Sequence, residues 1–315
     1  MMACPKVSIC IPAYRQAAFF QRALESVMRQ KFQDYEIIVS DDTPDDSVMI
    51  IAQAFAFGPR LKYFKNECRL GAPGNWNKAI SLASGEYIKV LHHDDWFYDA
   101  DSLGNFVKLL DENRCADFAF GASWNYAGDN TLVNRHFPGK AEVHLVVENP
   151  KALLRGNIIG SPSATIYRRN SDIQFDPKLK WLVDIDFYIR VLKRNKAVVF
   201  SDSANVCIGL EAGRVTEQCQ ANPQVEVWEA MYVYSKYKSK LSDFLRELDY
   251  FYFFFMKWDA AQLSGVSGLC KAQGFPLTAK MALFRVELDR SALFRKISCL
   301  KTALVNRLKR ITVSK

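Results

Sequence analysis

The sequence predicts an α/β fold in which helices cover both faces of a mostly parallel sheet. Two observations predict it. Short β-branched, apolar runs alternate with stretches of helical spacing along the first part of the chain, and such alternation is typical of parallel sheets. The chain also has 315 residues, of which 49% are hydrophobic, enough to bury one large core and a smaller appendage.

The alternation is regular as far as residue 91. Strands are expected at the short apolar runs, in residues 6–12, 35–42, 61–66 and 86–91. Helices are expected where apolar residues recur every three or four positions, in residues 19–30, 45–57 and 75–83. In the first of these helices Leu24, Val27 and Met28 share one side, and Asp45 or Asp46 lies at the cap of the second.

The pattern is looser beyond residue 116. Strands are expected in residues 116–127 and 196–202, and a helix in residues 181–195. Residues 149–169 read as a short helix, a loop and a strand, and residues 223–255 as mostly helix. We therefore expect two domains, an α/β domain of residues 1–220 and a helical C-terminal extension of residues 221–315.

Composition argues for a cytoplasmic protein. The eight cysteines contain no CxxC pair, which predicts reduced thiols and not a disulfide framework or a zinc site. The first residues have no basic leader ahead of a long apolar core, so no signal peptide is expected. The longest stretch without Asp, Glu, Lys or Arg is residues 47–59, short of the roughly 20 apolar residues that a membrane-spanning helix needs.

The net charge of +8 is concentrated at one end of the chain. Residues 285–315 contain nine Lys or Arg and two Asp or Glu, so the rest is nearly neutral. Nucleic-acid-binding proteins spread basic residues over a folded face, and no nucleic-acid partner is expected. Apolar residues recur at helical spacing among these cations in residues 293–311, which predicts a basic amphipathic helix on an anionic membrane surface. Docking of that helix on the protein itself, or on a second subunit, is the alternative.

Acidic residues follow two of the expected strands. Residues 41–42 are Asp-Asp and residues 92–95 are His-His-Asp-Asp. Ligands of parallel α/β sheets bind at the carboxyl ends of the strands, so both clusters are expected on one rim. Asp94 and Asp95 suit a hard cation such as Mg²⁺ or Mn²⁺. The alternative is that one of them only caps the segment that follows.

Three stretches in order carry a resemblance to a known family. They are residues 7–47 (VSICIPAY to SDDTPDDS), residues 66–96 (NECRLGAPGNWNKAI to VLHHDDW) and residues 181–192 (WLVDIDFYIRVL). Together they resemble the family-two inverting glycosyltransferases with the GT-A fold, of the bacterial cell-surface polysaccharide type. The resemblance covers about the first 200 residues. It implies a Rossmann-like catalytic domain that moves a sugar from a nucleotide-diphosphate sugar, UDP-sugar favoured, to a glycan or lipid-linked acceptor.

The resemblance also implies roles on the donor side. Pro12, Ala13 and Tyr14 line the nucleobase, and Asp41 faces the base or ribose with support from Asp42. The remaining nucleotide-sugar contacts are then Asn75, Lys78, Asp94 and Arg214. Arg214, in the stretch GRVTEQ, is expected to meet phosphate because a guanidinium forks onto phosphate oxygens; simple surface exposure is its alternative. The histidine that the family often has just upstream is missing here, where Glu211 stands.

By the same resemblance Asp184 is the catalytic base and Ser161 to Ser163 belong to an acceptor-side loop. A positioned base that takes a proton from the acceptor hydroxyl accelerates such reactions by ~10²–10⁴-fold. Asp94 and Asp95 would hold the Mn²⁺ or Mg²⁺ that stabilises the departing diphosphate. Residues two apart on a helix point away from each other, so Asp186 is not expected to share the role of Asp184. Helix capping is the alternative for Asp184.

One departure from the family pattern is His92, which stands where the family often has an aspartate. Imidazole ligates Mn²⁺, whereas Mg²⁺ prefers oxygen, and packing or support is favoured for His92 over direct ligation. The departure leaves open an alternative function, a catalytically inactive sugar-nucleotide or glycan-binding relative. A metal-dependent phosphohydrolase built on residues 92–95 is disfavoured because the chain has only four histidines.

Overall fold

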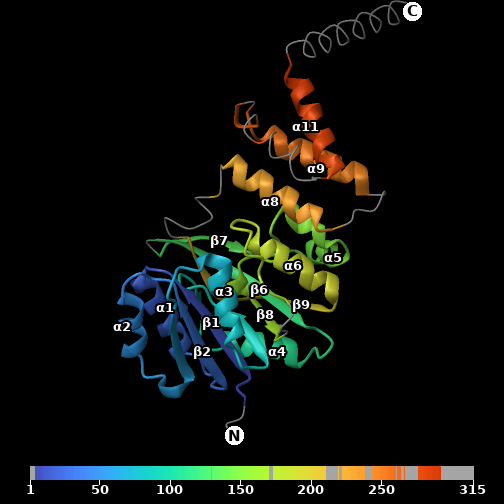
Figure 1. The fold of residues 1–315 in the computed structure, drawn as a ribbon. Helices are drawn as coiled ribbons and strands as arrows, with labels where there is room; N and C mark the ends of the chain where they lie inside the picture. The colour runs from blue at the N-terminus through green and yellow to red at the C-terminus, as the bar shows by residue number, and fades with distance from the viewer. Residues whose placement is uncertain are drawn as a thin grey trace, which may run out of the picture. The chain divides into compact units, whose positions relative to one another are not determined.

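The computed structural model describes residues 4–128, 130–169, 173–210, 219, 222–237, 243–259, 261–263, 266 and 276–291. The chain divides into two compact units, Met1–Gln218 and Cys219–Lys315 (Figure 1). Residues 293–311, where an amphipathic helix is expected, lie outside the described residues, as do Glu211 and Arg214.

The first unit is built on one sheet, with nine strands in the part of the chain that the structure describes. The strand order is β3 (Leu61–Lys65), β2 (Tyr35–Asp41), β1 (Val7–Ala13), β4 (Tyr87–Val90), β8 (Thr165–Arg168), β6 (Phe118–Ala127), β9 (Val198–Leu210) and β5 (Trp96–Phe97), with β7 (Leu132–His136) beside β6. The stretch from β3 to β4 is parallel, as is the β6–β9 pair. The predicted α/β fold with a mostly parallel sheet is confirmed, and β8, β7 and β5 add antiparallel pairs.

Apolar side chains of the strands and of the helices pack into a common core. In a strand every second side chain faces the same side, whereas in a helix residues three and four apart do so. The buried cluster follows both periods: Val7, Ile9, Ile11, Ile37, Val39, Phe20, Leu24, Val27, Leu103 and Phe106. Met28, expected beside Leu24 and Val27, is instead 44% exposed.

Helices cover the sheet in the order in which they follow the strands. They are α1 (Ala17–Met28), α2 (Ser47–Ala54), α3 (Gly71–Ser81), α4 (Ser102–Asp111), α5 (Lys140–Glu148) and α6 (Val183–Arg194). Figure 1 shows α1 and α2 to one side of β1 and β2, with α3 to the other. Helices therefore flank the parallel strands, and the carboxyl ends of these strands are left for a site.

Two boundaries differ from the sequence prediction for physical reasons. Helix α3 begins at Gly71 and not at residue 75, because proline is tolerated in a first turn and the Asp42 carboxylate accepts the Gly71 N–H at 2.9 Å. Strand β9 continues to Leu210, well past residue 202, since its polar residues pair with β6 across two shifts in register.

The second unit is helical where it is described. It contains α8 (Pro223–Ser235), α9 (Phe244–Met256) and α11 (Leu277–Arg290). The Asn222 side chain accepts the N–H groups of Gln224 and Val225, and Pro223 occupies the first turn, a favourable start for a helix. Among the described residues, none of the helices combines the length and apolarity needed to cross a bilayer.

Candidate active site

A cluster of one imidazole and two carboxylates follows β4. Ligand atoms of His92, Asp94 and Asp95 all lie within 4.8 Å of one another. Asp95 is only 2% exposed, and its carboxylate accepts the Gly209 N–H at 3.0 Å and the Ser161 hydroxyl at 3.3 Å. Burial and the nearby Asp94 raise the pKa of Asp95 to about 8. Two crowded carboxylates favour occupation by a cation.

The ring of His92 is the neutral member of this cluster. Its ring lies 4.5 Å from the Trp76 ring, between centroids, and its backbone N–H donates to the Ser163 hydroxyl at 2.9 Å. Burial lowers the pKa of His92 to about 4, so the ring is neutral at neutral pH. Its Nδ1 lies 3.8 Å from Asp95 Oδ2, and its buried Nε2 has no hydrogen-bond partner. Two carboxylates and a neutral imidazole are a donor set that fits Mn²⁺.

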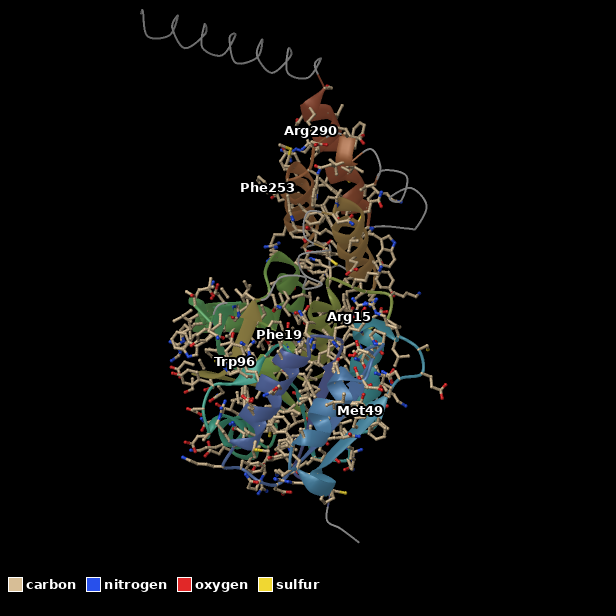
Figure 2. The ribbon with its side chains drawn as sticks, turned by 90° about the vertical axis from the view of Figure 1, so that its left-hand side faces the viewer. Arg15, Phe19, Met49, Trp96, Phe253 and Arg290 are labelled. Carbon is tan, nitrogen blue, oxygen red and sulfur yellow. The ribbon has the colours of Figure 1, made fainter. Side chains whose placement is uncertain are left out.

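Two residues distant in sequence hold the backbone of Asp94 in place. A Cβ atom at Gly209 would lie 2.4 Å from the Asp94 carbonyl oxygen, so only glycine fits this part of β9. Arg22 of α1 donates to the same carbonyl at 3.1 Å. Its guanidinium lies 3.7 Å from the ring centroid of Trp96 and 5.3 Å from that of Phe19, both labelled in Figure 2. Strand β9 and helix α1 thereby fix the Asp94–Asp95 segment from two sides.

Asp184 lies in the first turn of α6. Its Oδ2 accepts an N–H of the Asn157 side chain at 2.8 Å, and its Oδ1 accepts the Ile185 N–H at the same distance. Burial raises the pKa of Asp184 to about 6. Asp186 is buried and pairs with Arg190 at 2.9 Å. The two aspartates of this helix therefore have different partners and different surroundings.

The loop of residues 157–161 joins the two acidic groups. At one end Asn157 donates to Asp184, and at the other Ser161 donates to Asp95. Asn157 also bonds both the N–H and the carbonyl of Gly160, at 2.9 and 3.0 Å, which closes the loop on itself. Gly160 has φ +92°, and a Cβ there would lie 3.1 Å from the His136 ring, so glycine is required. One short, internally bonded loop thus contacts both Asp184 and Asp95.

Four of the residues expected on the donor side lie at the end of β1: Pro12, Ala13, Tyr14 and Asn75. Pro12 and Ala13 end β1, and the Ala13 carbonyl accepts the Asn75 side chain at 3.1 Å. Tyr14 is half-buried, with the guanidinium of Arg69 4.2 Å from its ring centroid. Lys78 is exposed on α3.

Asp41 and Asp42 are both engaged by the protein itself. Asp41 accepts the Thr43 N–H at 2.8 Å, the Tyr63 hydroxyl at 2.6 Å and the Lys65 ammonium at 3.3 Å. Asp42 accepts backbone N–H groups at the start of α3, from Leu70 at 3.1 Å and from Gly71 at 2.9 Å. The first of these carboxylates therefore anchors two strands, and the second caps a helix.

Sequence reasoning missed three residues that support the site. Asn157 and Gly209 carry no signal of their own, because their partners are 27 and 114 positions away. Lys89 does carry a signal, as a lone lysine in the apolar run YIKVL. It is fully buried, donates to the carbonyls of Val90 and Ser163, and burial lowers its pKa to about 7. Lys89 therefore fastens the Ser163 loop to β4.

Comparison with known proteins identifies the class of this fold and site. Residues 8–175 match the family described as Glycosyl transferase family 2. The chain belongs to this family.

Two curated relatives show the same class. The chain is 30% identical over 193 residues to the putative colanic acid biosynthesis glycosyl transferase WcaA of Escherichia coli, covering 60% of this chain and 66% of that protein. It is 37% identical over 93 residues to the GalNAc(5)-diNAcBac-PP-undecaprenol beta-1,3-glucosyltransferase of Campylobacter jejuni, covering 29% and 30%. The matched part thus spans no more than about two thirds of either relative's length.

Solved structures share the fold. Residues 1–349 of TarS from S. aureus, in complex with UDP-GlcNAc, align with a TM-score of 0.61 at 18% identity, over 90% of this chain and 80% of that one. The mannosyltransferase PcManGT from Pyrobaculum calidifontis, in complex with GDP-Man and Mn²⁺, aligns with a TM-score of 0.58 at 15% identity, over 96% and 86%. The GT-A fold expected from the sequence is therefore confirmed.

Proposed function

We propose that this chain is an inverting glycosyltransferase that moves a sugar from a nucleotide-diphosphate sugar to a glycan or lipid-linked acceptor. The observation that carries the proposal is the loop of residues 157–161, which contacts the Asp184 carboxylate at one end and Asp95 at the other. A base and a diphosphate-binding cluster at the two ends of one short loop suit a direct displacement between acceptor and donor.

In this mechanism Asp184 is the general base. Its carboxylate accepts the proton of the acceptor hydroxyl while that oxygen attacks the anomeric carbon and the bond to the diphosphate breaks. Attack from the side opposite the leaving group inverts the anomeric centre. The raised pKa of Asp184, about 6, suits a group that must be charged at neutral pH and still accept a proton.

Asp94 and Asp95 would hold a divalent cation, with His92 as a third ligand. When bound, the cation neutralises charge that develops on the departing diphosphate. The donor set of two carboxylates and one imidazole favours Mn²⁺ over Mg²⁺. This proposal revises the supporting role that the sequence favours for His92, because its ring belongs to the cluster and its Nδ1 lies 3.8 Å from Asp95 Oδ2.

The nucleotide would bind along the ends of β1 and β2. We assign Pro12, Ala13 and Tyr14 to the base, and Asp41, with support from Asp42, to the base or ribose. The other contacts are Asn75, Lys78, Asp94 and Arg214. UDP is the favoured nucleotide; TarS is recorded with UDP-GlcNAc, whereas PcManGT is recorded with GDP-Man.

The acceptor and location follow from the relatives and the charge. The name of the Campylobacter relative specifies a polyprenol-linked acceptor, which favours a lipid-linked glycan here. A lipid-linked acceptor and the basic residues 293–311 together argue for a cytoplasmic enzyme at the inner face of the plasma membrane, working in polysaccharide biosynthesis. Residues 1–220 would form the catalytic domain and residues 221–315 the helical extension.

The test separates chemistry from binding. Asp184→Asn removes the base but keeps the shape of the side chain, so turnover of the donor should fall by about 10²-fold or more. The affinity for a nucleoside diphosphate with Mn²⁺ should stay close to that of the native chain. Turnover can be followed by nucleotide release, and affinity by thermal shift. Asp186→Asn is less informative because it breaks a buried ion pair. Full turnover in Asp184→Asn would refute the assignment, and metal-dependent nucleotide binding by a native chain that turns over no donor would favour the inactive relative.

A further inference from the structure

Helix α11 exposes an apolar stripe. Its apolar residues fall into two sets, and Ala279, Ala282, Leu283 and Val286 are buried. The other set is exposed: Leu277 65%, Met281 43%, Phe284 62% and Leu288 38%. Steps of four and three place these four residues in one narrow line along the helix, opposite the buried set. A helix with two apolar sides has one side left to cover.

Cations flank the stripe. At 100° per residue, Lys280 lies on one edge of the stripe, beside Glu287, and Arg285 lies on the other. Lys280 and Arg285 are both exposed. The Arg285 guanidinium lies 4.4 Å from the Tyr252 ring centroid and 3.9 Å from Asp289, and so stays close to the helix surface. Basic residues beside a narrow apolar line are typical of helices that lie in the plane of a membrane interface.

The charge of the whole unit distinguishes between occupants of this stripe. Cys219–Lys315 contains sixteen Lys or Arg and eight Asp or Glu, which is the entire net charge of +8 of the chain. Two copies of so basic a unit repel each other. Residues 292–315, which follow the helix, contain seven Lys or Arg and no acidic residue. They therefore have no negative charge with which to complement the basic unit. An anionic lipid surface does complement it.

We propose that the α11 stripe of Leu277, Met281, Phe284 and Leu288 docks on an anionic lipid bilayer. The four apolar side chains enter the interface, and Lys280 and Arg285 meet lipid phosphates. The proposal does not depend on the transferase chemistry. It adds a second contact to the one proposed for residues 293–311.

Vesicle flotation of the full chain tests the stripe. Native protein should float with vesicles of phosphatidylglycerol and phosphatidylcholine, and much less with phosphatidylcholine alone. Met281→Ser combined with Phe284→Ser should weaken the partition by about tenfold or more, because two exposed apolar groups no longer enter the interface. The matched control is Ile50→Ser on α2, an apolar side chain that is 62% exposed, which should float like native protein.

A second measurement avoids dependence on the folding of the double variant. Brominated phosphatidylglycerol should quench the tryptophan fluorescence of Phe284→Trp more strongly than that of Ile50→Trp. Both variants keep the six native tryptophans, so the added tryptophan accounts for the difference. Equal quenching in the two variants would overturn the proposal. Flotation of the double variant like native protein would also overturn the proposal. Loss of binding in Leu300→Ser with Leu304→Ser would then leave only the contact of residues 293–311. Sedimentation would show instead whether the stripe joins two copies.

Discussion

The hydrogen bond from Asn157 to Asp184 affects the pKa of the proposed base, and with it the pH range of activity. Asn157 donates to the charged form of the carboxylate and so lowers its pKa, whereas burial raises that pKa to about 6. The base must be deprotonated to act. Activity of the native chain should therefore fall as pH drops through about 6.

Asn157→Ala should move this acid limb. Loss of this donor removes one of the hydrogen bonds that oppose the effect of burial. The pKa of Asp184 therefore rises, and kcat/KM should begin to fall at a higher pH than in the native chain. Near pH 8, where the base is charged in both proteins, the difference should be smallest. A full pH profile of kcat/KM measures the shift. Asn125→Ala is the matched control, because Asn125 pairs only with exposed Asn134 at 2.7 Å. An unmoved limb in Asn157→Ala would contradict the role given to this bond.

His92 offers a test of the metal ligands. His92→Asp replaces a neutral nitrogen ligand with a carboxylate and gives the Asp-x-Asp spacing. An all-oxygen set suits Mg²⁺ better than one that includes imidazole, so the ratio of activity in Mg²⁺ to that in Mn²⁺ should rise several-fold. The neighbouring His93→Asp, whose native ring bonds Gln16 at 2.9 Å, should leave the ratio as it is. The same ratio in native protein and His92→Asp would remove His92 from the ligands.

At the scale of elements, the site depends on strand β9 lying directly against the Asp94–Asp95 segment. Gly209 is the contact point, since its N–H donates to Asp95 and no Cβ fits beside the Asp94 carbonyl. The candidate site is therefore positioned by β9 as well as by the strands that end in acidic residues.

Gly209→Ala should disturb the cluster of His92, Asp94 and Asp95 although it replaces none of these residues. The added methyl group would have to move β9 or Asp94, at a cost of about 1–3 kcal/mol in the free energy of unfolding. Metal-dependent nucleotide affinity should fall with it. Gly156→Ala is the control, because a Cβ there meets nothing within 4 Å. Thermal unfolding and Mn²⁺ titration give both quantities, and an equal effect of the two substitutions would show that the close approach is unimportant.

The elements that could be predicted are those whose own residues show a strand or helix pattern. The first four parallel strands follow from β-branched runs, and the acidic residues expected at strand ends occupy those ends. Helix α3 starts four residues early because its cap, Asp42, comes from a different strand. Helices α4 and α5 and strands β5 and β7 were not predicted, and β9 was cut short where its sequence turns polar. Asn157, Gly209 and Arg22 reach the site only through contacts across the fold, which periodicity in one segment does not encode.

At the scale of the whole molecule, charge and chemistry are divided between the two units. His92, Asp94, Asp95 and Asp184 belong to Met1–Gln218, in which acidic and basic residues balance, whereas Cys219–Lys315 carries the net charge of +8. This division favours one unit for the reaction and another for the surface on which the reaction takes place.

A fragment of residues 1–218 should therefore keep nucleotide binding and lose vesicle binding. We expect it to unfold cooperatively and to be stabilised by a nucleoside diphosphate with Mn²⁺, as we also expect of the full chain. It should not float with anionic vesicles, since its net charge is zero. Thermal shift and flotation provide the measurements. A fragment that floats like the full chain would place the lipid contact in the first unit.

Asp41 and Asp42 also bear on how fast a donor can bind. Thr43, Tyr63 and Lys65 fix the direction of one carboxylate, and the start of α3 fixes the other, before any nucleotide arrives. A subsite built in advance needs no rearrangement to receive its ligand. In stopped-flow mixing, the observed rate of nucleotide association should then rise in a straight line with concentration and show no plateau.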